Sequence, residues 1–270
     1  MSAIRHFFLA LQFFTRIPLP GRLAAWVGFS PAMQRASLAY LPLVGVIMGG
    51  VAGCTCLVVV HWLPGLGAAP WIAAVLSTIV TVMVTGAFHE DGLADLADGI
   101  GGAVDRERAL AIMKDSRIGS YGAVALMLTL MLKVALIAGL LQVDPALAAW
   151  TMLAAHACSR LMPVGVAVCL PNVREMAESK SAVTASRPAL RTVLGACWWA
   201  ALPLAAAVVW LPRGFWAVGV VACVLAWLLM CRLLRRRLQG HTGDALGATQ
   251  QVCELAFYLG ILLGLGWALS

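Results

Sequence analysis

Four of the twelve acidic residues of this 270-residue chain crowd into nine positions, directly after a long apolar run. They are Glu90, Asp91, Asp95 and Asp98, in the segment FHEDGLADLADG, called here the acidic segment. On an α-helix the three aspartates would fall within about 60° of one another. Two such charges about 5 Å apart repel by roughly 3 kcal/mol at an effective dielectric near 20. The spacing therefore predicts a bound Mg²⁺, which takes one or two carboxylates together with substrate phosphates. The alternative is a solvated acidic loop at a membrane surface.

A second polar motif, MKDSRIGSYG, covers residues 113–122. Gly119 and Gly122 would let the backbone approach a ligand closely, and Lys114 and Arg117 could hold phosphate oxygens. The alternative is a helix end whose Lys and Arg side chains reach toward lipid headgroups. Because the motif follows the acidic segment on the same predicted membrane face, both interpretations stay open.

Further polar residues fall at or inside apolar runs. Asp244, between glycines in QGHTGDALG, could cap the last helix or add a ligand or a base. Lys133, Arg160 and Glu254 lie within apolar stretches, where ionisable groups are costly and face a protein interior or a cavity. An Arg160–Glu254 pair and a contact of Arg160 with substrate are both consistent with this pattern.

The composition identifies a membrane protein. Hydrophobic residues make up 62% and charged residues 11% of the chain, whereas charged residues make up about 25% of soluble domains. We expect an all-α, polytopic bundle that forms a single domain over 1–270, with a short interfacial helix over 4–19. Apolar stretches near the ~20 residues of a membrane span predict about seven crossings, at 38–62, 69–88, 121–141, 147–170, 192–211, 215–231 and 247–269. The tight turn between the fifth and sixth predicts that these two form an antiparallel hairpin.

The positive charges predict the orientation. Sixteen of the nineteen Lys and Arg residues fall in four groups of four, before the first span and in every second loop after it. Positive loops stay in the cytoplasm, so we expect a cytoplasmic N-terminus and a site that faces the cytoplasm. The net charge of +7 then reflects this topology and an attraction to anionic lipid headgroups. No nucleic-acid partner is needed to explain it. The eight cysteines show no spacing typical of a disulfide framework or a zinc site.

Several motifs together carry a family resemblance. The acidic segment, MKDSRIGSYG, the opening FFTRIP at 13–18 and TGD at 242–244 occur in one order along the chain. In this combination the sequence resembles the cobalamin synthase family, the adenosylcobinamide-GDP ribazoletransferases. The resemblance implies a Mg²⁺-dependent enzyme of the bacterial cytoplasmic (inner) membrane. It would join adenosylcobinamide-GDP with α-ribazole or α-ribazole 5′-phosphate and release GMP, late in vitamin B12 synthesis.

The resemblance also implies roles for residues. The metal and pyrophosphate site would comprise Glu90, Asp91, Asp95 and Asp98. The family's basic motif would place Lys114, Asp115 and Arg117 at the substrate. From the residues themselves we add Gly119, Arg160 and Asp244 as candidate substrate-binding residues. Our hypothesis is that the ribose 3′-hydroxyl attacks the phosphorus nearer cobinamide, and that Asp91, Asp95 or His89 accepts its proton.

Two rival functions remain open at this stage. CDP-alcohol phosphotransferases perform similar chemistry with the signature DGxxAR, but here Asp91-Gly92-Leu93-Ala94 is followed by Asp95. A transporter would use Lys133, Arg160 and Glu254 along its path. Membrane lipid, a second copy of the chain and other cobalamin-assembly enzymes are further expected partners.

Overall fold

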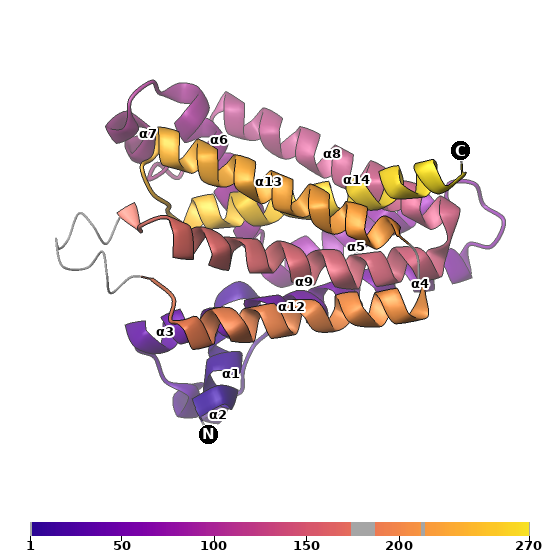
Figure 1. The fold of residues 1–270 in the computed structure, drawn as a ribbon, viewed down its shortest axis with the longest axis horizontal. Coiled ribbons are helices and arrows are strands. Elements are labelled where there is room, and N and C mark those ends of the chain that lie inside the picture. Colours follow the sequence, from indigo (N-terminus) through magenta and orange to yellow (C-terminus); the bar gives the residue numbers. More distant parts are fainter. Residues whose placement is uncertain (1, 174–186, 212–213, 270) are drawn as a thin grey trace.

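The computed structural model describes residues 2–173, 187–211 and 214–269, and all its regular elements are helices. Long helices lie roughly parallel and form the body of the molecule (Figure 1). They are α4 (Leu41–Trp62), α5 (Ala69–Thr85), α8 (Ser120–Val143), α9 (Pro145–Cys169), α12 (Leu190–Trp210), α13 (Phe215–Arg237) and α14 (Gly243–Leu269). Shorter helices gather at one end: α1 (Ser2–Phe14), α2 (Gly21–Val27), α3 (Pro31–Ser37), the 3₁₀ turn η1 (Leu38–Tyr40), α6 (Phe88–Gly102) and α7 (Arg106–Ile112).

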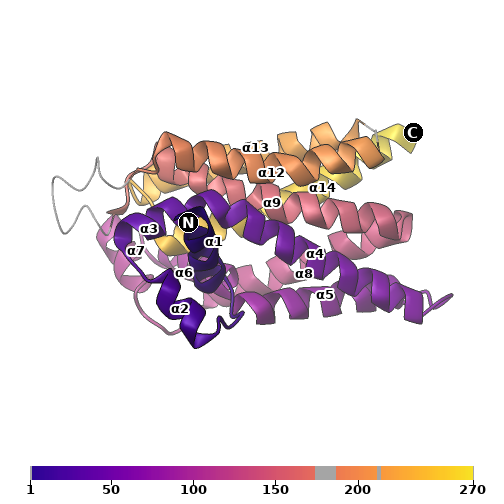
Figure 2. The ribbon, with the colours of Figure 1, turned by 90° about the horizontal axis from the view of Figure 1, so that it is seen from below.

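The expected all-α, multi-span architecture is confirmed. Six described helices are long and apolar enough to cross a membrane, and the count is seven if α5 and α6 form one broken span. The expected N-terminal apolar helix is α1. The end of the bundle that carries α1, α6 and α7 also carries the start of α12 and the end of α13, so the described arginines of the four basic groups lie there together (Figure 2). That this end faces the cytoplasm stays a prediction.

A stripe of glycines brings α4 against α9. A Cβ atom on Gly45 would come within 2.3 Å of the His156 carbonyl oxygen, and one on Gly49 within 2.7 Å of the Met152 carbonyl oxygen. Because lipid gives no hydrophobic drive for helices to associate, small residues at every fourth position let two backbones meet and gain dispersion contacts. This close contact fixes α9, which lies at the centre of the bundle and is its most buried span.

The fifth and sixth spans do not pack on each other as the predicted hairpin, so this prediction is wrong. The two helices, α12 and α13, are adjacent in the chain, but α12 packs mainly on α9 and α13 packs mainly on α14. The physical reason is again close approach: a Cβ on Gly260 of α14 would lie 2.8 Å from the Cα of Gly219 on α13. The short connection between them therefore constrains chain direction and does not determine the packing partner.

The chain turns by 89° between α5 and α6. Gly86 and Ala87 both have positive φ, at 67° and 58°, which ends α5 and redirects the backbone. The side chain of Arg16 packs directly over Gly86, where a Cβ would overlap it, and the Arg16 amide donates to the Val84 carbonyl at 2.6 Å. The FFTRIP motif thus supports the turn that carries the acidic segment.

A buried polar network crosses the middle of the bundle. Its centre is Glu254 of α14, whose side chain is 1% exposed. Its neighbours are Gln250 Nε2 (2.6 Å), Lys133 Nζ (2.7 Å), the Tyr258 hydroxyl (3.4 Å), His156 Nδ1 (3.5 Å) and Arg160 NH1 (3.9 Å). The Arg160–Glu254 pair that the sequence left open is therefore present. Glu90 lies near enough to Arg160 for electrostatic attraction, so two cations face two carboxylates. The network ties α6, α8, α9 and α14 together.

We expect Glu254→Gln to lower the thermal unfolding midpoint markedly in detergent, because it leaves Lys133 buried without its carboxylate. Breaking one side of a buried pair costs about 3–5 kcal/mol. The double variant Lys133→Met, Glu254→Gln should recover part of the loss, because the positive charge of Arg160 and the negative charge of Glu90 then still compensate each other. The exposed Glu107→Gln serves as a matched control. Equal midpoints for Glu254→Gln and the wild type would show that the network does not stabilise the fold.

Candidate active site on helix α6

The acidic segment forms α6, which packs across the first turns of α14. A Cβ on Gly92 would lie 2.6 Å from the Asp244 carbonyl oxygen, and Gly247 lies against the backbone of His89. At the other end of α6, the Arg237 guanidinium donates to the Ile100 carbonyl at 2.9 Å. Glycine on both helices lets α6 lie close to α14, so that its polar face is held in a fixed direction.

Two of the four predicted metal ligands, Glu90 and Asp98, accept hydrogen bonds from other parts of the fold. Glu90 is buried and accepts a hydrogen bond from Gln251 Nε2 at 2.9 Å, and its other oxygen is buried without a described partner. Asp98 accepts the backbone N–H groups of Gly119 (2.7 Å) and Gly122 (2.8 Å) and so caps the first turn of α8. Gly119, predicted to approach a ligand, donates its amide to Asp98, and its role in binding substrate stays a prediction.

The other two carboxylates form the accessible pair. The Asp91 side chain is exposed and makes no hydrogen bond or ion pair with the residues that the structure describes, and Asp95 follows one turn later, half-buried and with an interaction partner in the protein. Within the described ranges, no three His, Cys, Asp or Glu side chains are arranged to hold a metal ion. Two carboxylates one turn apart nevertheless fit Mg²⁺, which usually completes its coordination with water and substrate phosphate. The four-carboxylate site stays a prediction, and the geometry favours this pair within it.

The basic motif forms an exposed turn between α7 and α8. The Arg117 guanidinium donates to both carboxylate oxygens of Asp115, with a shortest distance of 2.6 Å, and Arg117 is 86% exposed. These hydrogen bonds lower the pKa of Asp115 to about 2. The Lys114 side chain is exposed and makes no polar contact with the described residues. Because Asp98 anchors Gly119, this turn lies beside the C-terminal half of α6.

The TGD motif begins α14. Thr242, and not Asp244, supplies the cap, since its hydroxyl accepts the Ala245 amide at 3.1 Å. Asp244 lies in the first turn, where a carboxylate interacts favourably with the helix dipole. The neighbouring His241 pairs with the end of α9 through the Pro171 carbonyl. Burial lowers the pKa of His241 to about 4, and its Nδ1 has no partner in the described part of the chain.

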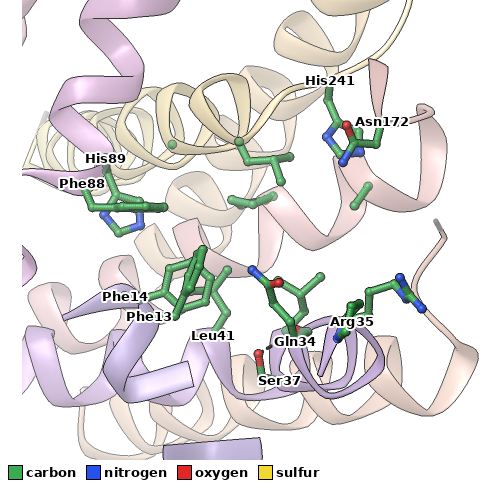
Figure 3. A pocket seen from close by; sticks show the side chains of 17 residues that line it. Phe13, Phe14, Gln34, Arg35, Ser37, Leu41, Phe88, His89, Asn172 and His241 are labelled. Atoms are coloured by element: carbon green, nitrogen blue, oxygen red, sulfur yellow. Dashed lines mark hydrogen bonds between the residues drawn. The ribbon is translucent and has the colours of Figure 1, made fainter. Parts of the chain in front are cut away.

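A cavity of about 250 Å³ opens at the start of α6 (Figure 3). Its lining is mainly apolar, with Phe13 and Phe14 of α1 and Phe88 of α6 on one side. His89 and His241 also line it, and the Gln34 side chain projects toward its middle. The sequence motifs FFTRIP, FHEDG and HTGD therefore meet at one place.

Arg160 lies outside this cavity. Its side chain is 3% exposed and contacts His156 and Glu254, although Pro163, one turn further along α9, lines the cavity. Sequence reasoning did not identify the cavity itself, and the signal that could have revealed it was the pair of aromatic residues in FFTRIP beside Phe88. A role for Arg160 in binding substrate stays a prediction.

Comparisons with known proteins identify the family. The family model described as cobalamin-5-phosphate synthase matches residues 6–262. The chain is 48% identical to an adenosylcobinamide-GDP ribazoletransferase of Albidiferax ferrireducens, over 97% of this chain and 99% of that protein. It is 49% identical to one of Polaromonas naphthalenivorans (98% and 100%) and 42% identical to one of Shewanella amazonensis (95% and 94%). No solved structure matches the chain significantly.

The match covers almost the whole chain and includes every motif that forms the site around α6. The chain therefore belongs to the cobalamin-5-phosphate synthase family of enzymes.

Proposed function

We propose that this protein transfers α-ribazole, or its 5′-phosphate, to adenosylcobinamide-GDP and releases GMP, in a Mg²⁺-dependent reaction at the cytoplasmic face of the inner membrane. The relatives are named adenosylcobinamide-GDP ribazoletransferases, and this supports the reaction. The observation that carries the proposal is the accessible Asp91 carboxylate, one turn before the half-buried Asp95, on a helix whose Glu90 and Asp98 accept hydrogen bonds from the rest of the fold.

The arrangement along α6 suggests how the reactants are held. The cavity lies at its N-terminal end, Asp91 and Asp95 follow within two turns, and the basic turn lies beside its C-terminal half. A pyrophosphate at the carboxylates would thus lie between a pocket for one substrate and cations for the other. Lys114 would attract the departing phosphate, and Arg117 could do so by exchanging Asp115 for a phosphate oxygen.

The proton of the attacking ribose hydroxyl needs an acceptor. Asp91 is exposed and His89 lines the cavity, so both are candidates for this role. Mg²⁺ held by Asp91 and Asp95 would supply charge neutralisation at the pyrophosphate. The protein residues would fix the two substrates in line and exclude water from the apolar side of the site.

The contacts argue against the transporter alternative. A transporter would use Lys133, Arg160 and Glu254 along its path. Here Lys133 and Arg160 both contact Glu254 within the bundle, and none of the three lines the cavity. An ion pair in this place holds helices together, whereas a transport path needs polar groups open to water.

Asp91→Asn should reduce turnover at least about a hundredfold, as expected for losing a transition-state contact, while the unfolding midpoint stays at the wild-type value. Asp98→Ala should lower the midpoint, because it leaves two backbone N–H groups at the start of α8 without acceptors, at about 1–3 kcal/mol each. GMP release and thermal unfolding measured on both variants separate the roles. Near-normal turnover by Asp91→Asn would remove this residue from the reaction.

Chelation tests the metal requirement. GMP release from adenosylcobinamide-GDP in the presence of α-ribazole should stop in EDTA and return when Mg²⁺ is added in excess. Ca²⁺ should restore much less, because it prefers more ligands at longer distances. Release that continues unchanged in EDTA would contradict a role for a divalent ion.

A further inference from the structure

Three phenylalanines form an aromatic cluster on the wall of the cavity. The ring centroids of Phe13, Phe14 and Phe88 are 5.0–5.7 Å apart, and the rings meet edge to face. Phe13 is 44% exposed and Phe88 is 36% exposed, although both belong to a packed cluster. Side chains from α1 and α6 converge here on an open space (Figure 3). This cluster is built from two sequence motifs and has no other described function.

The cluster stands in a fixed relation to the carboxylates. Phe88, Asp91 and Asp95 are spaced by three and four residues, so they form one stripe along α6. At 1.5 Å per residue, Asp91 lies about 4.5 Å beyond Phe88 along the helix axis. That distance is about the reach from a nucleoside base to the hydroxyls of its ribose. A base against Phe88 would therefore direct its sugar toward Asp91.

We propose that this cavity binds the fused-ring aryl base of the nucleoside substrate, the benzimidazole of α-ribazole. The inference rests on the proposed function and adds where that substrate is held. Aromatic faces and edges stack on planar bases, and each stacked base contributes to binding. The ribose then projects along α6 to the accessible carboxylates.

Size and polarity select this ligand among the parts of both substrates. The cavity, at about 250 Å³, lies just below the ~300–1,000 Å³ of pockets that enclose drug-sized ligands, so it suits one base and is too small for a corrin ring. Guanine carries several donors and acceptors on its edge, and each would need a partner when buried. The lining is mainly apolar, and the polar residues on it are Gln34, Arg35, Ser37, His89, Asn172 and His241. The phenylalanine wall suits a benzimidazole, whose edge is a hydrocarbon.

The test is a steady-state comparison of the two substrates. Phe88→Ala should raise the KM for α-ribazole about tenfold or more, in line with the stacking contribution of one aromatic side chain. The KM for adenosylcobinamide-GDP should change less than about twofold. Phe88→Trp should keep most of the affinity for α-ribazole, because it keeps a stacking surface. Phe29→Ala removes a phenylalanine that is exposed and outside the cavity, and should leave both constants unchanged.

The outcomes separate this inference from the proposed function. Wild-type turnover of the two substrates tests the function alone. If the wild type turns over but Phe88→Ala leaves the KM for α-ribazole unchanged, the base binds elsewhere and the cluster is a membrane-interface feature. If Phe88→Ala instead raises the KM for adenosylcobinamide-GDP, the cavity holds guanine and the proposal is wrong. If the wild type releases no GMP, the proposed function itself fails.

Discussion

The fixed position of α6 across the start of α14 is the constraint on which the site depends. The contact requires glycine, because a Cβ on Gly92 would overlap the backbone at Asp244. Three further contacts hold the helix: Glu90 with Gln251, Asp98 with the first turn of α8, and Arg237 with the last turn of α6. Each of these uses a polar side chain of the acidic segment or a basic residue near it. The stripe of Phe88, Asp91 and Asp95 lies on the helix that these contacts hold in place.

The charged residues inside the bundle also help to hold α6 in position. Glu254 lies one turn after Gln250 and Gln251 on α14, so the network that it centres on is continuous with the contact that holds Glu90. Burying charge is expensive in a membrane, and close pairing of cations with carboxylates offsets that cost. The network thus makes the arrangement of α8, α9 and α14 specific, and α6 is positioned on that frame.

Much of the fold could be predicted from the sequence, because apolar length and the alternation of basic loops are strong signals in membrane proteins. The helices over 41–62, 120–143 and 243–269 lie close to their expected ranges. The packing of α12 and α13 was not predictable, since it depends on glycines that meet across helices far apart in the chain. The site was predictable in part. Spacing placed three aspartates on one face of a helix, but only tertiary contacts separate Asp98, which caps α8, from Asp91, which stays accessible.

A metal shared between the α6 carboxylates and the nucleotide can be observed by loading the protein with Mn²⁺ in place of Mg²⁺ and recording its electron paramagnetic resonance in the presence of adenosylcobinamide-GDP. We expect a protein-bound ion whose spectrum shows coupling to the pyrophosphate phosphorus, and the loss of that species in Asp91→Asn. A spectrum of free hydrated Mn²⁺, or one that Asp91→Asn leaves unchanged, would contradict a metal shared between these carboxylates and the nucleotide.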